Sequence, residues 1–109
     1  MRYKRRYIIL RITGVSSQDE FSNSVYSTIN KFYPLLVIRA NVKIIKDVYS
    51  ISDDAYTGII SVNNRYKYDV IFTLSLMKRV FSRDVLTLGI SGTLKRTKKR
   101  LNTYGSDAK

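Results

Sequence analysis

The chain contains no cysteine and no histidine among its 109 residues. Without cysteine, neither a disulfide framework nor a thiolate metal site can form. Without histidine, the commonest general base and metal ligand is missing, so Ser-His, Cys-His and zinc sites cannot be assembled. The neighbouring Asp53 and Asp54 diverge in an extended chain and are more typical of a solvated turn than of a cation site. We therefore expect no catalytic residue and no cofactor bound by this protein.

Long apolar runs and phosphate-loop motifs are also missing. No run approaches the ~20 residues that a bilayer span needs. The apolar residues 8–12 are interrupted by Arg11 and precede no small-residue cleavage site, unlike a signal peptide. Gly89 and Gly92 lack phosphate-loop spacing, and no GxGxxG motif is present. These observations favour a cytoplasmic protein with no membrane partner.

Acidic residues are few, since 8 of them face 20 lysines and arginines and leave a net charge of +12. The excess is concentrated in two distant segments without any acid. Residues 1–18 contain Arg2, Lys4, Arg5, Arg6 and Arg11, and residues 85–106 contain Lys95, Arg96, Lys98, Lys99 and Arg100. Charge runs are often only solvated surfaces, but clustering without acids carries a self-repulsion that a polyanion would relieve.

Apolar periodicity predicts strands over residues 3–13, 39–50, 56–62 and 85–93. Ser17 and Glu20 form a capping box that opens a helix ending before Pro34. Asn63 or Asn64 caps a second helix. Residues 94–101 are expected to form a basic helix, followed by a flexible tail over residues 102–109. We expect one domain, residues 1–101.

Each element is expected to turn one set of side chains toward the core. In the helices these are Phe21, Val25, Ile29, Phe32, Val70, Leu74, Met77 and Phe81. In the strands they are Ile8, Leu10, Ile12, Val42, Ile44, Val48, Leu86, Leu88 and Ile90.

The strand–helix–strand–strand–helix–strand order predicts an α+β, ferredoxin-like or RRM-like two-layer sandwich with a four-stranded antiparallel sheet and a basic C-terminal extension. Right-handed crossovers place the first and third strands in the centre and the fourth beside the first. The two basic segments should then meet at one edge of the sheet. The opposite edge should collect acids, namely Asp19, Glu20, Asp53, Asp54 and Asp84.

The basic edge is the candidate surface for RNA, because lysine and arginine bind phosphates and interleaved tyrosines can stack bases. The candidate contacts are Arg2, Tyr3, Lys4, Arg5, Arg6, Tyr7, Arg65, Lys67, Lys95, Arg96, Lys98, Lys99 and Arg100. The open sheet face lacks the aromatics of an RRM and should expose Ile9, Ile45 and Ile59, which suit a protein partner. These isoleucines could equally be ordinary half-exposed strand residues. DNA, an anionic membrane, another structured RNA or an acidic protein would also satisfy the charge.

Three sequence blocks carry a family resemblance. They are RYKRRYIIL at residues 2–10, AYTGII at residues 55–60 and GTLKRT at residues 92–97. In this order and spacing the chain resembles the Pop-type protein subunit of ribonuclease P, called protein component 2 in archaea and shared with the MRP particle in eukaryotes. The short chain is similar to the archaeal form.

The resemblance implies an RRM-like fold and a non-catalytic place in the holoenzyme that removes 5′ leaders from precursor tRNA. In that particle the RNA hydrolyses the phosphodiester with magnesium ions. The family's protein pairs with a TIM-barrel subunit, as a heterotetramer, and binds the RNA beside other ribonuclease P proteins. The alternatives that the residues leave open are a ribosomal or other structured-RNA-binding protein and a protein-bridging module with a basic edge.

Overall fold

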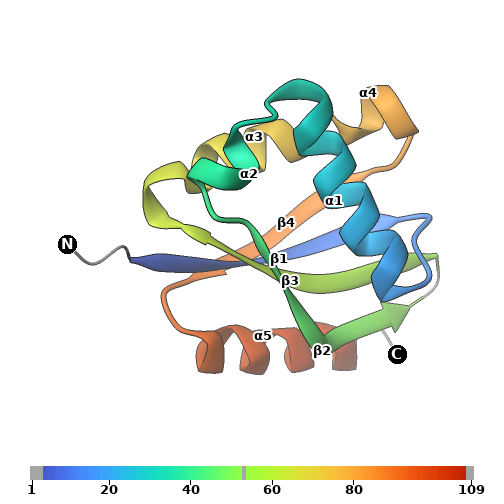
Figure 1. Cartoon of the computed structure of the whole chain (residues 1–109). Helices are drawn as coiled ribbons and strands as arrows, with labels where there is room; N and C mark the ends of the chain where they lie inside the picture. The colour runs from blue at the N-terminus through green and yellow to red at the C-terminus, as the bar shows by residue number, and fades with distance from the viewer. Residues whose placement is uncertain (1–3, 53, 108–109) are drawn as a thin grey trace.

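The computed structural model describes residues 4–52 and 54–107. Figure 1 shows a twisted sheet with α1 to α4 on one face and α5 on the other. The strands are β1 (Arg5–Thr13), β2 (Lys43–Ser52), β3 (Ala55–Asn63) and β4 (Val85–Ser91). They are antiparallel in the order β2-β3-β1-β4. The expected ferredoxin-like topology is confirmed, with β1 and β3 central and β4 beside β1.

The helical elements are α1 (Gln18–Phe32), α2 (Leu36–Arg39), the 3-10 turn η1 (Asn64–Tyr66), α3 (Lys67–Ser75), α4 (Met77–Phe81) and α5 (Leu94–Asp107). Helix α1 begins and ends close to its expected signals. The sequence did not predict α2, and a break at Leu76 divides the expected second helix into α3 and α4. Ser17 caps α1, because its side chain accepts a hydrogen bond from the Glu20 amide at 3.2 Å. The carboxylate of Glu20 accepts from the Ser16 amide at 3.3 Å, one residue before the position that a standard capping box uses.

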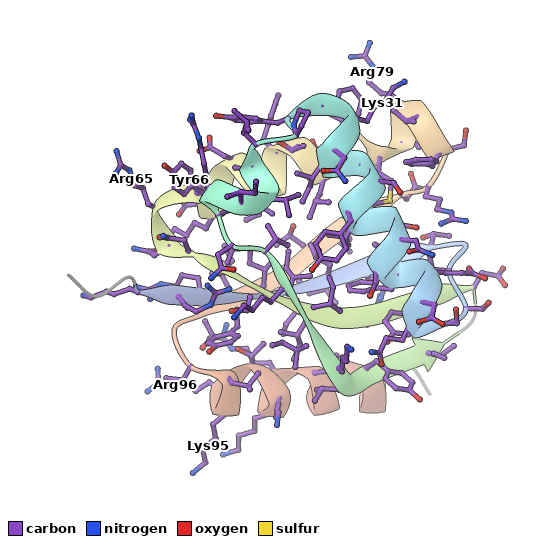
Figure 2. All side chains as sticks on the ribbon, in the orientation of Figure 1. Lys31, Arg65, Tyr66, Arg79, Lys95 and Arg96 are labelled. Atoms are coloured by element: carbon purple, nitrogen blue, oxygen red, sulfur yellow. The ribbon has the colours of Figure 1, made fainter. Side chains whose placement is uncertain are left out.

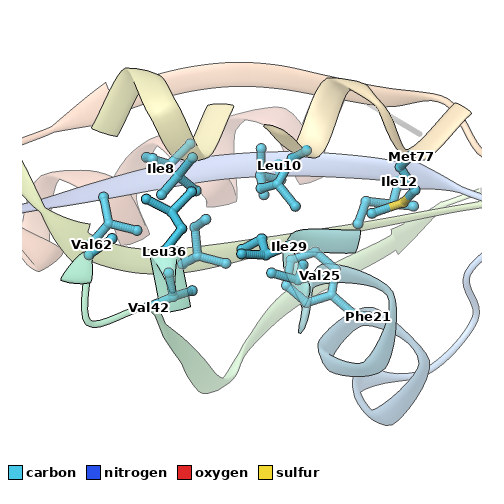
Figure 3. Packing of buried hydrophobic residues seen from close by; sticks show 14 of the residues in the cluster. Ile8, Leu10, Ile12, Phe21, Val25, Ile29, Leu36, Val42, Val62 and Met77 are labelled. Atoms are coloured by element: carbon cyan, nitrogen blue, oxygen red, sulfur yellow. The ribbon is translucent and has the colours of Figure 1, made fainter. Parts of the chain in front are cut away.

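A continuous core fills the space between the sheet and α1 to α4. Figure 3 shows this packing, in which side chains from the central strands meet those of α1, α2 and α4. Its fully buried members include Ile8, Leu10, Ile12, Phe21, Val25, Ile29, Leu36, Ile60, Val62, Val70, Leu74 and Met77. The expected inward stripes of α1 and the second helix are confirmed except at their last members. Phe32 and Phe81 are both exposed.

A β-bulge in β4 overturns part of the expected alternation. The pairing of β1 with β4 shifts between Ile9, which faces Gly89, and Leu10, which faces Thr87. Leu88 is therefore the extra residue of the bulge. On one side of it, the residues of β4 face the opposite side of the sheet from the one that strict alternation predicts. Leu86 is 54% exposed, so its predicted place in the core is wrong. Leu88 packs on the opposite sheet face, while Ile90 contacts the main core as expected.

A second irregularity lies in β2, whose pairing with β3 shifts between Ile44 and Tyr49. Ile44 packs against the main core, as expected, and Val42 is buried in it. Val48 packs instead against the cluster on the opposite sheet face, so its predicted position is wrong. A strict two-residue alternation does not hold across an irregular strand.

The helix α5 covers the sheet face that was expected to be open. It contacts β1, β2 and β4, and its Leu101 is 2% exposed against Ile9 and Ile59. Ile9 is 1% and Ile59 0% exposed, so the prediction that both face solvent is wrong; Ile45 is half-buried in the same cluster. The helix also continues through Asp107, beyond the expected boundary at residue 101. Residues 108–109 of the expected tail lie outside the described residues.

Candidate nucleic-acid interface

The register of the sheet brings four segments to one end of the molecule. Arg5 pairs with Asn63, Lys43 with Ser61, and Tyr7 with Ser91. The starts of β1 and β2 therefore lie beside the ends of β3 and β4. We call this region the basic end; it comprises Lys4, Arg5, Arg6, Arg39, Lys43, Arg65, Lys67, Lys95 and Arg96. Figure 2 shows Arg65, Lys95 and Arg96 projecting on this side of the molecule.

The two basic tracts, far apart in sequence, meet at Arg6 and Gly92. A Cβ atom built at Gly92 would lie 3.5 Å from Nη1 of Arg6. The same Nη1 donates a hydrogen bond to the Arg5 carbonyl oxygen at 3.0 Å. The start of α5 thus lies directly beside the start of β1, as the strand order predicts.

From this end the basic residues continue along α5. Lys95, Arg96, Lys98, Lys99 and Arg100 are all exposed. Their intervening neighbours Leu94, Thr97 and Leu101 are wholly or partly buried, at spacings of three and four residues. The charged face of α5 is therefore its outer face. Arg100 is turned back to the sheet, and its Nη1 donates to the Ile90 carbonyl oxygen at 3.2 Å.

The opposite end of the sheet carries acidic residues. The amides of Thr13 and Gly14 donate to the carbonyl oxygens of Asp84 and Asp54, at 3.0 and 2.5 Å, which joins both acidic turns to the end of β1. Lys78 and Asp84 form an ion pair there at 3.2 Å. Asp19 and Glu20 belong to the first turn of α1 near the same loops. The expected Asp53 lies outside the described residues.

The side chains of the predicted RNA contacts differ in their exposure to solvent. Arg2 and Tyr3 lie outside the described residues. Tyr7 is half-buried and packs against the cluster beneath α5, which does not fit an open stacking platform. Lys67 is half-buried as well, with its Nζ 5.0 Å from the centroid of the Tyr68 ring. Lys4, Arg65 and the five cations of α5 are exposed.

Sequence reasoning missed Arg39 and Lys43 of the basic end, and also the neighbouring Asn41. Arg39 and Asn41 line a pocket of about 410 Å³ together with Arg5 and Arg65. The signal was present, because the predicted strand order already places the segment before β2 at the same end as the start of β1. It was overlooked because Arg39 stands alone in a charge-balanced stretch of sequence.

Within the described part of the chain, no three His, Cys, Asp or Glu residues gather into a possible metal site. In the same part, every helix is too short or too polar to cross a bilayer. The basic end presents concentrated positive charge, and the guanidinium groups of Arg5 and Arg6 donate hydrogen bonds to neutral oxygens. Such a surface can bind phosphates.

The fold and the charge distribution together define a small ferredoxin-like domain with a strongly basic end. Its sequence matches the model of the Rpp14/Pop5 family over residues 6–102. Ribonuclease P protein component 2 of Pyrococcus furiosus is 29% identical in an alignment that covers 96% of this chain and 89% of that protein. The protein of the same name from Thermococcus kodakarensis is 30% identical with the same coverage.

The chain belongs to the Rpp14/Pop5 family. The resemblance carried by the three sequence blocks is thereby confirmed, including its archaeal character. Membership assigns the chain a role in ribonuclease P, an endoribonuclease of tRNA processing.

Proposed function

We propose that this chain binds and stabilises the catalytic RNA of ribonuclease P and so supports removal of 5′ leaders from precursor tRNA. The observation that carries the proposal is the basic end, where four segments bring positive charge together. Three of them form a pocket that no carboxylate of the described residues lines. Phosphates packed together in a folded RNA repel each other, and fixed lysines and arginines lower that repulsion. The RNA can then keep its magnesium-binding core folded at moderate salt.

In this proposal the chain is a non-catalytic subunit. The absence of histidine and cysteine from the sequence removes the usual acid–base and nucleophilic groups, and the RNA with its magnesium ions carries out hydrolysis of precursor tRNA. The chain works in the cytoplasm with other ribonuclease P proteins, in a heterotetramer with a TIM-barrel subunit. Because α5 covers Ile9 and Ile59, we expect that partner to dock on another surface.

The test compares two double charge reversals on the full chain. Lys95→Glu with Arg96→Glu alters the basic end, and Lys31→Glu with Arg79→Glu alters exposed positions on the helical layer, away from it (Figure 2). Both variants change the net charge by the same amount, and all four side chains are exposed. Filter binding to the organism's own ribonuclease P RNA should weaken at least about tenfold for the first variant, a loss of roughly 1.4 kcal/mol. The second should stay within about threefold of the wild type.

Equal losses in the two variants would show that net charge, not this surface, binds the RNA, and the proposal would fail. A ribosomal RNA fragment of matched length serves as competitor. If it displaces the ribonuclease P RNA at equal concentration, the chain is a general structured-RNA-binding protein. Weak, non-saturating retention of every RNA is the result expected of a protein-bridging module.

A further inference from the structure

The pocket at the basic end is built by three separate segments. Arg5 comes from the start of β1, Ile38, Arg39 and Asn41 from α2 and the turn after it, and Asn63, Arg65 and Tyr66 from the end of β3 and η1. Its volume is about 410 Å³, within the usual range of small-ligand sites. Of the residues that the structure describes, three arginines and no acid line it. Like charges converging on one cavity repel each other unless an anion occupies it.

Arg5 is held in place by neutral groups. Its Nε donates to Ser61 Oγ at 2.6 Å, and its Nη2 donates to the carbonyl oxygens of Asn41 and Ser61 at 2.6 and 2.8 Å. These bonds fix the guanidinium plane without neutralising its charge. Within the described residues its Nη1 has no hydrogen-bond partner, so that donor is available to a ligand. A fixed guanidinium loses little conformational entropy when it binds an anion.

Arg39 and Arg65 complete the cationic lining from the other two segments. Both side chains are exposed, and within the described residues neither forms an ion pair. The position of Arg65 is set by its backbone, whose amide donates to Asn63 Oδ1 at 3.0 Å. The guanidinium carbon of Arg65 lies 5.8 Å from the centroid of the Tyr66 ring. Planar guanidinium groups bind phosphate through paired hydrogen bonds.

The remaining lining is unlike that of a simple anion site. Ile38 is 77% exposed, which is unusual for an isoleucine, and Tyr66 is half-buried beside it in the lining. They give the pocket an apolar wall on which a flat ring can lie. The Asn41 side-chain amide, which has no partner among the described residues, and the Asn63 amide can pair with the edge of a base.

We infer that this pocket binds one unstacked ribonucleotide of the RNA partner. Arg5, Arg39 and Arg65 hold its phosphate, and its base lies against Ile38 and Tyr66. The inference rests on the proposed function and deepens it. The outer face of α5 can contact phosphates at any point along the RNA backbone. The pocket, by contrast, binds one particular nucleotide and so sets the register of the RNA on the protein.

The test uses the full chain with small probes and no RNA. Calorimetric or NMR titrations compare adenosine, cytidine, guanosine and uridine 5′-monophosphates with adenosine alone and with inorganic phosphate. At least one monophosphate should bind at 1:1 stoichiometry and at least about fivefold tighter than adenosine or phosphate. Arg39→Gln with Arg65→Gln should weaken that binding about tenfold. The control Lys31→Gln with Arg79→Gln removes the same charge and should change it less than about twofold.

A second measurement applies to the RNA. Ribonuclease P RNA containing 4-thiouridine should crosslink to the peptide that contains Tyr66, and the Arg39→Gln, Arg65→Gln variant should lose that crosslink. Inorganic phosphate binding as tightly as every monophosphate, or a double variant that binds like the wild type, overturns the inference. If wild-type chain retains the RNA but the crosslink is absent, the pocket inference fails alone. If wild-type chain does not retain the RNA, the proposed function fails, and the monophosphate titrations still decide what the pocket binds.

Discussion

Gly58 lies in the middle of β3, opposite Leu10 of β1. A Cβ atom at this position would lie 3.0 Å from ring carbons of both Phe21 and Tyr56. Those two rings are fully or almost fully buried, with centroids 4.9 Å apart. The two aromatic rings therefore occupy the space that a side chain at position 58 would need. This explains in physical terms one residue of the AYTGII block, which sequence analysis used only as part of a resemblance.

We expect Gly58→Ala to lower the free energy of unfolding by about 1–3 kcal/mol, because two buried rings must shift to admit the methyl group. Urea denaturation followed by circular dichroism measures the change. Gly92→Ala is the matched control, since its Cβ would meet only the flexible guanidinium of Arg6, at 3.5 Å or more. It should alter stability by less than about 1 kcal/mol. Equal effects of the two substitutions would contradict the packing argument.

Tyr26 provides a second residue-scale prediction. Its hydroxyl donates to the Val42 carbonyl oxygen at 3.1 Å. Burial raises the pKa of this phenol above its ordinary value, and a hydrogen bond with the Ile44 backbone offsets part of the rise. The folded state thus favours the neutral phenol, so its contribution to stability is complete below about pH 10 and is lost as the pH rises through the folded-state pKa.

Tyr26→Phe should therefore be less stable than the wild type at neutral pH, by about 1 kcal/mol for the lost hydrogen bond. Above about pH 10 the difference in unfolding free energy between the two proteins should shrink. The unfolded wild-type chain ionises Tyr26 more readily than the folded one, which favours unfolding, and the phenylalanine variant has no such group. Urea denaturation of both proteins between about pH 7 and 11 measures the difference. A gap that stays constant over the range would show that Tyr26 titrates alike in the folded and unfolded chains.

At the scale of the elements, the sequence predicts the strands and the two long helical segments, because these depend on local periodicity and caps. It predicts the strand order because crossovers are right-handed. It does not predict the bulge that exposes Leu86 or the irregularity that turns Val48. Bulges arise from pairing with a neighbouring strand, which the local pattern does not contain. The covering role of α5 was missed because Thr97, a polar residue, interrupts its inner stripe between Leu94 and Leu101.

The covering role of α5 predicts the effect of Leu101→Ala. Leu101 is buried against Ile9 and Ile59, so its truncation should destabilise the whole domain by about 2 kcal/mol, at the low end for a buried leucine near the surface. Urea denaturation measures the loss. Lys98→Ala, on the exposed side of the same helix, should change stability by less than about 0.5 kcal/mol. If Leu101→Ala leaves the unfolding midpoint unchanged, α5 does not belong to the cooperative unit.

At the scale of the whole molecule, the meeting of the two basic tracts was predictable because strand order alone decides it. The pocket was not, because its three arginines come from segments separated by more than twenty residues each. Its shape also depends on Asn41, which adopts a positive φ of 49° in the turn before β2. The strand order is enough to predict which charged segments meet at one end of the sheet. The pocket depends in addition on the conformation of the loops at that end, which the sequence pattern does not give.

Separation of charge along the molecule predicts how salt should act on RNA binding. If the basic end and α5 together neutralise about six phosphates, the logarithm of the association constant should fall with the logarithm of salt concentration with a slope of roughly −4 to −5. Lys95→Gln with Arg96→Gln should reduce the magnitude of that slope by about 1 to 2, since two phosphate contacts are lost. Lys31→Gln with Arg79→Gln should leave it unchanged. Filter binding between about 0.05 and 0.3 M salt gives the three slopes. A common slope for all three proteins would mean that the phosphates are bound somewhere other than the end where β1, β4 and α5 meet.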